Sequence, residues 1–207
     1  MDLNLILAIV VGSMFMAGLV LLTIFLIRGV GRIYVPMDEP FAALGFTAES
    51  RGGLGRRFTG SYAGREVSVL FRPRHKFASK FDVHMSGGHQ HTLSVGLGRP
   101  VLTRGDWKRV PGPLSGLDKY KVYSLDPAWA ASFLQGDALR RALFLLEQDY
   151  ERRREQPREV YLRPGEVLLR RVPPQSQGMY RLGEITVQDL SSWLDALAAL
   201  ASLAEAA

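Results

Sequence analysis

Histidine supplies the sharpest local candidate for chemistry. All four histidines lie between His75 and His91, and His89 and His91 share the two-residue spacing that places side chains on one face of a strand. Imidazole is a common ligand of zinc and other transition metals. Strand alternation places His84 on the face opposite His91, and Asp82 is the one carboxylate nearby, so three converging ligands would need a bulge. We therefore expect no metal site, with His84, His89 and His91 as the only candidate ligands.

A second candidate is the basic segment from residue 51 to residue 80. It carries eight arginines and lysines against one acidic residue, Glu66. Such a segment could contact a protein partner or the anionic headgroups of a membrane. The alternative is an ordinary solvated surface, because strand alternation would spread these side chains over both faces of a sheet. The basic residues are Arg51, Arg56, Arg57, Arg65, Arg72, Arg74, Lys76 and Lys80.

Motifs of known enzymes are absent from the sequence. It has no phosphate-binding loop, no Gly-x-Ser-x-Gly elbow, no His-Glu-x-x-His and no cysteine. The glycines at 53 and 55 lead to Phe58, where a dinucleotide fingerprint requires glycine. A hydrolase built from dispersed residues would have to use His84 with Asp82. We expect no cofactor, and no nucleic acid partner because the basic segment lacks interleaved aromatic residues.

An apolar run opens the chain that carries these candidates. From Leu3 to Ile27 no side chain is charged. A helix of that length spans about 37 Å, which exceeds the hydrocarbon core of a bilayer at about 30 Å. The run has no polar stripe of the kind that a core helix of a soluble protein shows. The pattern predicts one transmembrane helix.

A cleavable signal peptide is the alternative interpretation of this run. A signal peptide needs basic residues before a shorter apolar run and small residues at the cleavage site. Asp2 is the one charged residue before the run, and residues 25–28 are large, so we expect the helix to be retained. Arg28 and Arg32 follow the run, and no basic residue precedes it, which predicts a cytoplasmic C-terminal side. The arginine-rich composition is typical of a GC-rich genome, and we expect a single-pass protein of the bacterial cytoplasmic membrane.

Alternating apolar residues predict hairpins in the remaining chain. One hairpin flanks Ala63 and Gly64, and another flanks Pro164 and Gly165, the preferred central pair of a type II turn. Residues 81–85 and 93–97 also alternate, which predicts a further hairpin with a loop at residues 86–90. Its expected register pairs Met85 with His91, Val83 with Leu93 and Phe81 with Val95.

Start and stop signals mark several helices. Asp38 and Gly45 bound a short helix, Asp126 precedes Pro127 at the start of another, and Asp137 begins a third. The last helix is expected from Thr186 to about Ala204, with Asp189 in the place of a capping-box acid.

Together these elements predict an α+β fold of antiparallel hairpins packed with about three helices. The expected domains are a transmembrane anchor at residues 1–28, a linker with a short helix at 29–52, and one α+β domain at 53–207. For function we expect a non-enzymatic binding or accessory module that contacts a protein partner or the anionic membrane surface. The alternative is a membrane-tethered hydrolase or metal-dependent enzyme whose site no motif reveals.

Overall fold

The computed structural model divides the chain into two compact units, Met1–Asp38 and Glu39–Ala207. In the first unit residues 11–24 are helical, and all of them are exposed. The rest of the predicted apolar run lies outside the described residues. Among the helices that are described, none is both long and apolar enough to cross a membrane. The structure describes residues 11–24, 38–51, 55–72, 80–97, 106–111, 116–148, 156–172 and 185–207.

The described part of the second unit is built on one antiparallel sheet of nine strands in the order β1-β2-β3-β4-β9-β8-β5-β7-β6. Residues 38–43 and the elements α2, α3 and α5 are helical, so the predicted α+β class is confirmed. The strands are β1 (Thr47–Arg51), β2 (Gly55–Tyr62), β3 (Arg65–Arg72), β4 (Lys80–Ser86), β5 (Leu93–Gly96), β6 (Lys108–Arg109), β7 (Lys121–Ser124), β8 (Gln156–Arg163) and β9 (Glu166–Val172). The labelled helices are α2 (Pro127–Phe133), α3 (Gly136–Glu147) and α5 (Val187–Ala206). β1 lies within the range 29–52 that the sequence assigns to the linker and short helix.

Two predicted hairpins are confirmed. β2 and β3 pair around Ala63 and Gly64, which have φ angles of 49° and 75°. A two-residue turn with both angles positive matches the twist of the strands that it joins. β8 and β9 pair around Pro164 and Gly165, and Gly165 has a φ of 80°.

The predicted pairing of residues 81–85 with 91–95 is wrong. β4 lies between β3 and β9, so Val83 faces Val69 on one side and Leu169 on the other. β5 pairs instead with β8 and β7. The loop at 87–92 is bonded to the turn of the β8–β9 hairpin, since Gly87 donates to the Gly165 carbonyl and Gly165 donates to the His89 carbonyl. The hairpin therefore occupies the place beside β4 that the sequence assigns to β5.

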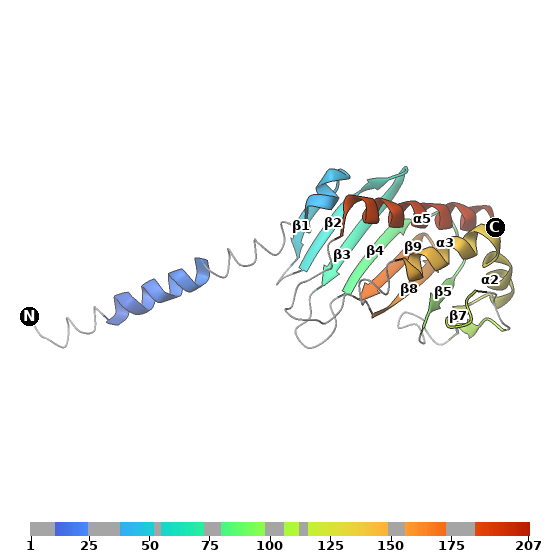
Figure 1. The fold of residues 1–207 in the computed structure, drawn as a ribbon, viewed down its shortest axis with the longest axis horizontal. Coiled ribbons are helices and arrows are strands. Elements are labelled where there is room, and N and C mark those ends of the chain that lie inside the picture. The colour runs from blue at the N-terminus through green and yellow to red at the C-terminus, as the bar shows by residue number, and fades with distance from the viewer. Residues whose placement is uncertain are drawn as a thin grey trace, which may run out of the picture. The chain divides into compact units, whose positions relative to one another are not determined.

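The helices cover one face of the sheet. Figure 1 shows α3 and α5 lying on the same side of the strands. Trp193 of α5 is 1% exposed, packs against Phe81 and holds the Arg171 guanidinium 3.7 Å from its ring centre. Phe41, from residues 38–43, stacks on Phe58 at 3.9 Å. The predicted capping box of α5 is present, with Thr186 and Asp189 bonding each other's backbone N–H groups.

Strand alternation sends the intervening side chains to the opposite face, which we name the distal face because it points away from α3 and α5. Directly paired residues of antiparallel strands share a face, so the registers define its members. They include Arg57, Thr59, Ser68, Leu70, Arg72, Asp82, His84, Glu159, Tyr161, Arg163, Glu166, Leu168 and Arg170.

Engineered cysteines can test the position of β4, because the chain has none of its own. Ser86 and Glu166 are register partners, and such partners have Cα atoms about 4.5–5.5 Å apart, within reach of a disulfide. We expect Ser86→Cys with Glu166→Cys to cross-link under mild oxidation, measured as loss of two free thiols by mass spectrometry. The control, His84→Cys with Thr92→Cys, would be adjacent only in the predicted β4–β5 hairpin and should stay reduced. The reverse result would contradict the strand order.

Candidate functional site

The distal face carries charged side chains at its centre, where β4, β9 and β8 lie side by side. They form a group that we name the central network. Its members come from β4 and from the β8–β9 hairpin, which are far apart in the sequence, since β4 ends at residue 86 and β8 begins at residue 156. The central network comprises Asp82, His84, Glu159, Tyr161, Arg163, Glu166 and Arg170.

Asp82 and Arg170 form a buried bidentate pair. They are directly opposite each other in the β4–β9 register, and the guanidinium donates to both carboxylate oxygens at 2.8 and 3.0 Å. The residues are 7% and 8% exposed. Burial is the largest single effect and would lower the pKa of Arg170, but the hydrogen bonds and charge of Asp82, together with Tyr161 and Glu159, raise it overall. The two-point contact therefore holds β4 and β9 together at the centre of the face.

Glu166 joins two cationic or potentially cationic partners. Its Oε2 accepts from Nδ1 of His84 at 3.1 Å, and its Oε1 accepts from Arg163 at 3.3 Å. The hydrogen bond from His84 is the main reason that the pKa of Glu166 lies below its ordinary value, with Arg163 adding to the effect. All three side chains are about one-third exposed, so solvent reaches this part of the network.

Tyr161 is fully buried on the distal face. Its hydroxyl donates to Glu159 at 2.6 Å, and the guanidinium carbons of Arg163 and Arg170 lie 5.7 and 6.0 Å from its ring centre. Cation–π contacts of this kind favour a fixed ring. Tyr161 thus links the two ion pairs of the network.

The catalytic pair considered from the sequence does not form. Asp82 and His84 do share the distal face, but Asp82 is bonded to Arg170 and His84 to Glu166. Ser68 is opposite His84 in the register, yet its hydroxyl accepts from Arg57 at 3.0 Å. Within the described residues, no serine hydroxyl is hydrogen-bonded to His84, so a Ser-His-acid relay is incomplete there.

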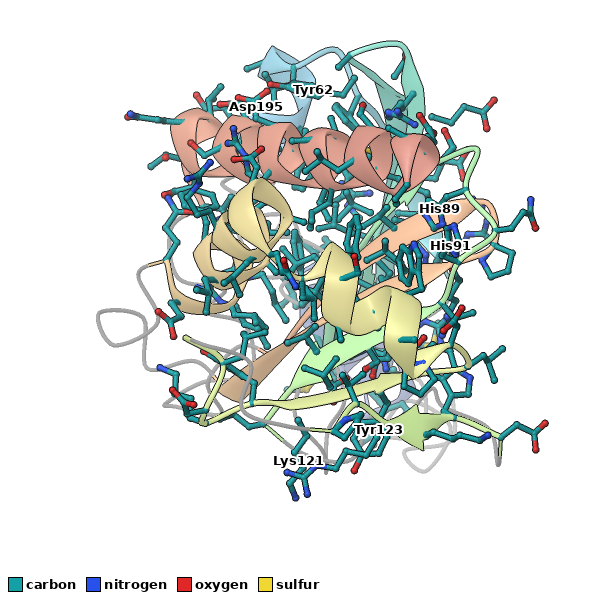
Figure 2. All side chains as sticks on the ribbon, turned by 90° about the vertical axis from the view of Figure 1, so that its right-hand side faces the viewer. Tyr62, His89, His91, Lys121, Tyr123 and Asp195 are labelled. Atoms are coloured by element: carbon teal, nitrogen blue, oxygen red, sulfur yellow. The ribbon has the colours of Figure 1, made fainter. Side chains whose placement is uncertain are left out.

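The candidate metal ligands are also separated. His84 belongs to the central network, whereas His89 is 3% exposed and lies in the loop at 87–92. His91 stacks on Trp129 of α2 at 4.1 Å, with ring planes 5° apart. Figure 2 shows His89 and His91 near the C-terminal end of α5. In the part of the chain that the structure describes, no three histidine or acidic side chains gather as a metal site would require.

The loop that holds these histidines is clamped to α5. Arg65 donates to both oxygens of Glu205 at 2.6 and 2.7 Å, to Ser202 at 3.0 Å and to the Ser86 carbonyl at 3.2 Å. Glu205 also accepts from the Gly88 backbone at 2.5 Å. The hydrogen bonds from Arg65, and then that from Gly88, lower the pKa of Glu205 to about 2. Arg65 is therefore a structural residue rather than a free surface cation.

We name the contacts of Arg65 and Glu205 the clamp. His89 is buried in the loop that the clamp holds. Burial lowers its pKa, although the nearby His91 backbone and Glu205 act in the opposite direction. A side chain at Gly87 would bring a Cβ within 3.1 Å of the imidazole, so the loop leaves no spare room beside the ring. The arrangement favours a neutral packing role for His89.

The basic segment divides between the two faces. Arg57 and Arg72 lie on the distal face, as does Arg51, whose register partner is Gly55 of β2. Lys80 is opposite Arg72. We name Arg51, Arg57, Arg72 and the Lys80 position the basic corner. Arg56 and Arg65 lie on the helix-covered face, and Arg74 and Lys76 lie outside the described residues.

Sequence reasoning missed most of the central network. The sequence pattern was used to place the apolar residues of β8 and β9. The polar residues that alternate with them mark the opposite face of the sheet, and these are the residues of the central network. Glu159, Tyr161 and Arg163 alternate along β8, and Glu166 and Arg170 lie at the same period in β9. The pattern shows that these side chains share a face of the sheet. It cannot show that Arg170 pairs with Asp82, because the two residues are 88 positions apart in the chain.

The described residues define a class of fold, an α+β protein whose open antiparallel sheet has helices on one face and a charged network on the other. No family model and no curated protein sequence matches the chain. The structure is similar to the crystal structure of the mycobacterial trehalose monomycolate transport factor A, TtfA, with a TM-score of 0.53 and 16% sequence identity. The likeness covers 85% of this chain and 94% of that one. At this identity it shows a shared fold.

The buried pair provides a stability test. Arg170→Met should lower the free energy of unfolding by about 3 kcal/mol, because it leaves the Asp82 carboxylate buried without its partner. Combining it with Asp82→Leu should restore much of the loss, since no unpaired charge remains. Urea denaturation measures both. The exposed control Arg140→Met should change stability by less than about 0.5 kcal/mol, and an Arg170→Met effect no larger than this would contradict the assignment.

The clamp predicts a dependence of stability on acidity. The pKa of Glu205 is lower in the folded chain than its ordinary 4.5, so its stabilising contribution is complete above that value and is lost as the pH falls toward about 2. Unfolding free energies between these values should fall more steeply for the native chain than for Glu205→Gln, by about 1 kcal/mol because the group is partly exposed. Arg65→Gln should flatten the profile in the same way. Parallel profiles for all three proteins would contradict a structural role for the clamp.

Proposed function

We propose that this chain is a membrane-anchored, non-catalytic accessory protein of an assembly that moves lipids across or along a bacterial cytoplasmic membrane. The observation that carries the proposal is the apolar helix at residues 11–24, which is attached to a domain with its own core. Every residue of this helix is exposed, including Met14 at 71% and Phe15 at 70%. Keeping such side chains in water is unfavourable by about 25 cal/mol per Å² of apolar surface, and a bilayer removes that cost.

The fold likeness supports the choice of process. TtfA is described as a trehalose monomycolate transport factor, and the likeness extends over most of both chains. A shared fold does not by itself transfer a function. Here it agrees with the apolar N-terminal run, since a factor for lipid transport acts at a membrane. Arg28 and Arg32 favour a domain on the cytoplasmic side.

A non-catalytic role is supported by the chemistry of the described residues. His84, Asp82 and Glu166 of the distal face are engaged in hydrogen bonds that position one another. An enzyme site would direct such groups toward a substrate in a pocket. The central network is better suited to fixing the shape and charge of a binding surface.

Membrane extraction of the full chain tests the proposal. Alkaline carbonate removes peripheral proteins, and we expect the full chain to stay in the membrane pellet. Phe15→Arg with Leu19→Arg should release most of it, because each arginine at the centre of a span opposes insertion by about 2.5–3.5 kcal/mol. The control adds the same charge to two exposed positions, Ser132→Arg on α2 and Gln135→Arg just after it, and should remain in the pellet. Release of the native chain by carbonate would refute the anchor.

The accessory role needs a second readout from the same membranes. Cross-linking in intact cells followed by mass spectrometry should join the native chain to an integral membrane protein that transports lipids or glycolipids. The double-arginine variant of the helix at 11–24 should lose that cross-link. Cross-links confined to soluble enzymes would contradict the accessory role while leaving the anchor intact.

A further inference from the structure

The sheet register gathers positive charge at one end of the distal face. β1 and β3 end there and β2 and β4 begin there, so Arg51, Arg57 and Arg72 come from three adjacent strands, with Lys80 at the start of a fourth. From the sequence we expected alternation to spread the basic segment over both faces. The structure places these four positions of the eight on a single face and at a single end.

Acidic neighbours offset only part of the positive charge of this basic corner. Glu49 is opposite Arg57, while Asp82, the next carboxylate along β4, is bonded to Arg170. Glu66 also lies on the distal face, but it is near the start of β3, whereas Arg72 is at the end of that strand. Glu66 is therefore at the other end of the face. Within the described part of strands β1 to β4, the corner thus has an excess of positive charge.

The exposed arginines of the corner have no anionic partner within the chain as described. Arg51 and Arg72 are both exposed, and among the described residues neither makes an ion pair or a side-chain hydrogen bond. Among the described residues, Arg57 donates to the neutral hydroxyl of Ser68 and to no carboxylate. By contrast, Arg65, Arg163 and Arg170 are all paired with carboxylates. The corner therefore differs from these other arginines of the sheet in being available to an external anion.

We propose that the basic corner binds the anionic lipid headgroups of the leaflet to which the chain is anchored. The inference rests on the proposed anchor, because the tether keeps the corner close to that leaflet. Nine residues lie between Arg28 and Asp38, so the two are at most about 35 Å apart when the chain is fully extended. Each basic side chain that reaches an anionic surface strengthens binding roughly fivefold. The described corner has no aromatic side chain on which a base could stack, so single-stranded nucleic acid fits it less well.

Single-cysteine reporters in the full chain can test the contact. Ser50 and Ser132 are both exposed serines, on β1 and α2, and the chain has no cysteine of its own. Strand alternation directs Ser50 to the face opposite Arg51, but β1 is an edge strand, so a fluorophore on a flexible linker at position 50 can reach the corner. Each site, changed to cysteine and labelled with a fluorophore, is placed in nanodiscs of phosphatidylcholine alone or mixed with phosphatidylglycerol. A small fraction of the lipids carries a quencher on the headgroup, so loss of fluorescence reports contact between the labelled site and the lipid surface. We expect at least roughly fivefold more quenching at position 50 in the anionic discs, loss of this gain in high salt, and no gain at position 132.

Matched charge variants decide whether the corner is responsible. Arg51→Gln with Arg72→Gln should abolish the gain at position 50, whereas Arg140→Gln with Arg141→Gln on α3 removes the same charge and should preserve it. Equal quenching in both lipids, or equal loss in both variants, overturns the inference. RNA binding through Arg51 and Arg72 without a lipid response also overturns it. Failure of the native chain to enter neutral nanodiscs would refute the anchor instead, so the two proposals can fail separately.

Discussion

Burial of α5 against the sheet is the constraint on which the rest of the domain depends. Its inward residues Trp193, Leu194 and Leu197 are at most 1% exposed, and they can be buried only against a continuous apolar surface. Each central strand supplies that surface through alternate residues, such as Val69 in β3 and Val83 in β4. Hydrophobic burial is the largest favourable term in folding, so this requirement fixes the face to which each side chain points. A slip of one residue in any strand would expose that strand's apolar set.

The same requirement determines the chemistry of the distal face. Polar residues of the strands must point away from α5, and the buried ones among them need partners because an unpaired buried charge is costly. Asp82 with Arg170 and Glu159 with Tyr161 meet this need across neighbouring positions. At the positive end of the face, Arg51 and Arg72 are exposed and solvated, so no such need arises. Burial therefore explains why the charges at the centre of the face are paired and those at its end are solvated. The paired charges have a structural role, and the solvated charges are exposed to an external ligand.

These features suit a protein whose sheet presents a charged surface of fixed shape. The similarity to TtfA shows that this arrangement of helices and strands is a fold that the two chains share. Precise placement of a charged face does not need catalytic groups. It needs a rigid sheet, and the clamp between Arg65 and Glu205 together with the Trp193 contacts supplies the rigidity at both ends of α5.

The sequence by itself determined the local features of this protein. Alternation identified the apolar faces of β2, β3, β8 and β9. Turn residues marked the Ala63–Gly64 and Pro164–Gly165 turns, and the capping-box spacing marked Thr186, because each of these signals depends on residues a few positions apart. The sequence also marked the charge-free run that contains residues 11–24. The tertiary structure alone decided that β9 rather than β5 lies beside β4, that the candidate histidines separate, and that the basic residues divide into a corner and a clamp. Alternation fixes the direction of a side chain but not the neighbouring strand, since many apolar strands pair about equally well. The choice of neighbouring strand depends on how the β8–β9 hairpin packs beside β4 and under α5. It is made by contacts between residues that are far apart in the chain, such as Asp82 and Arg170.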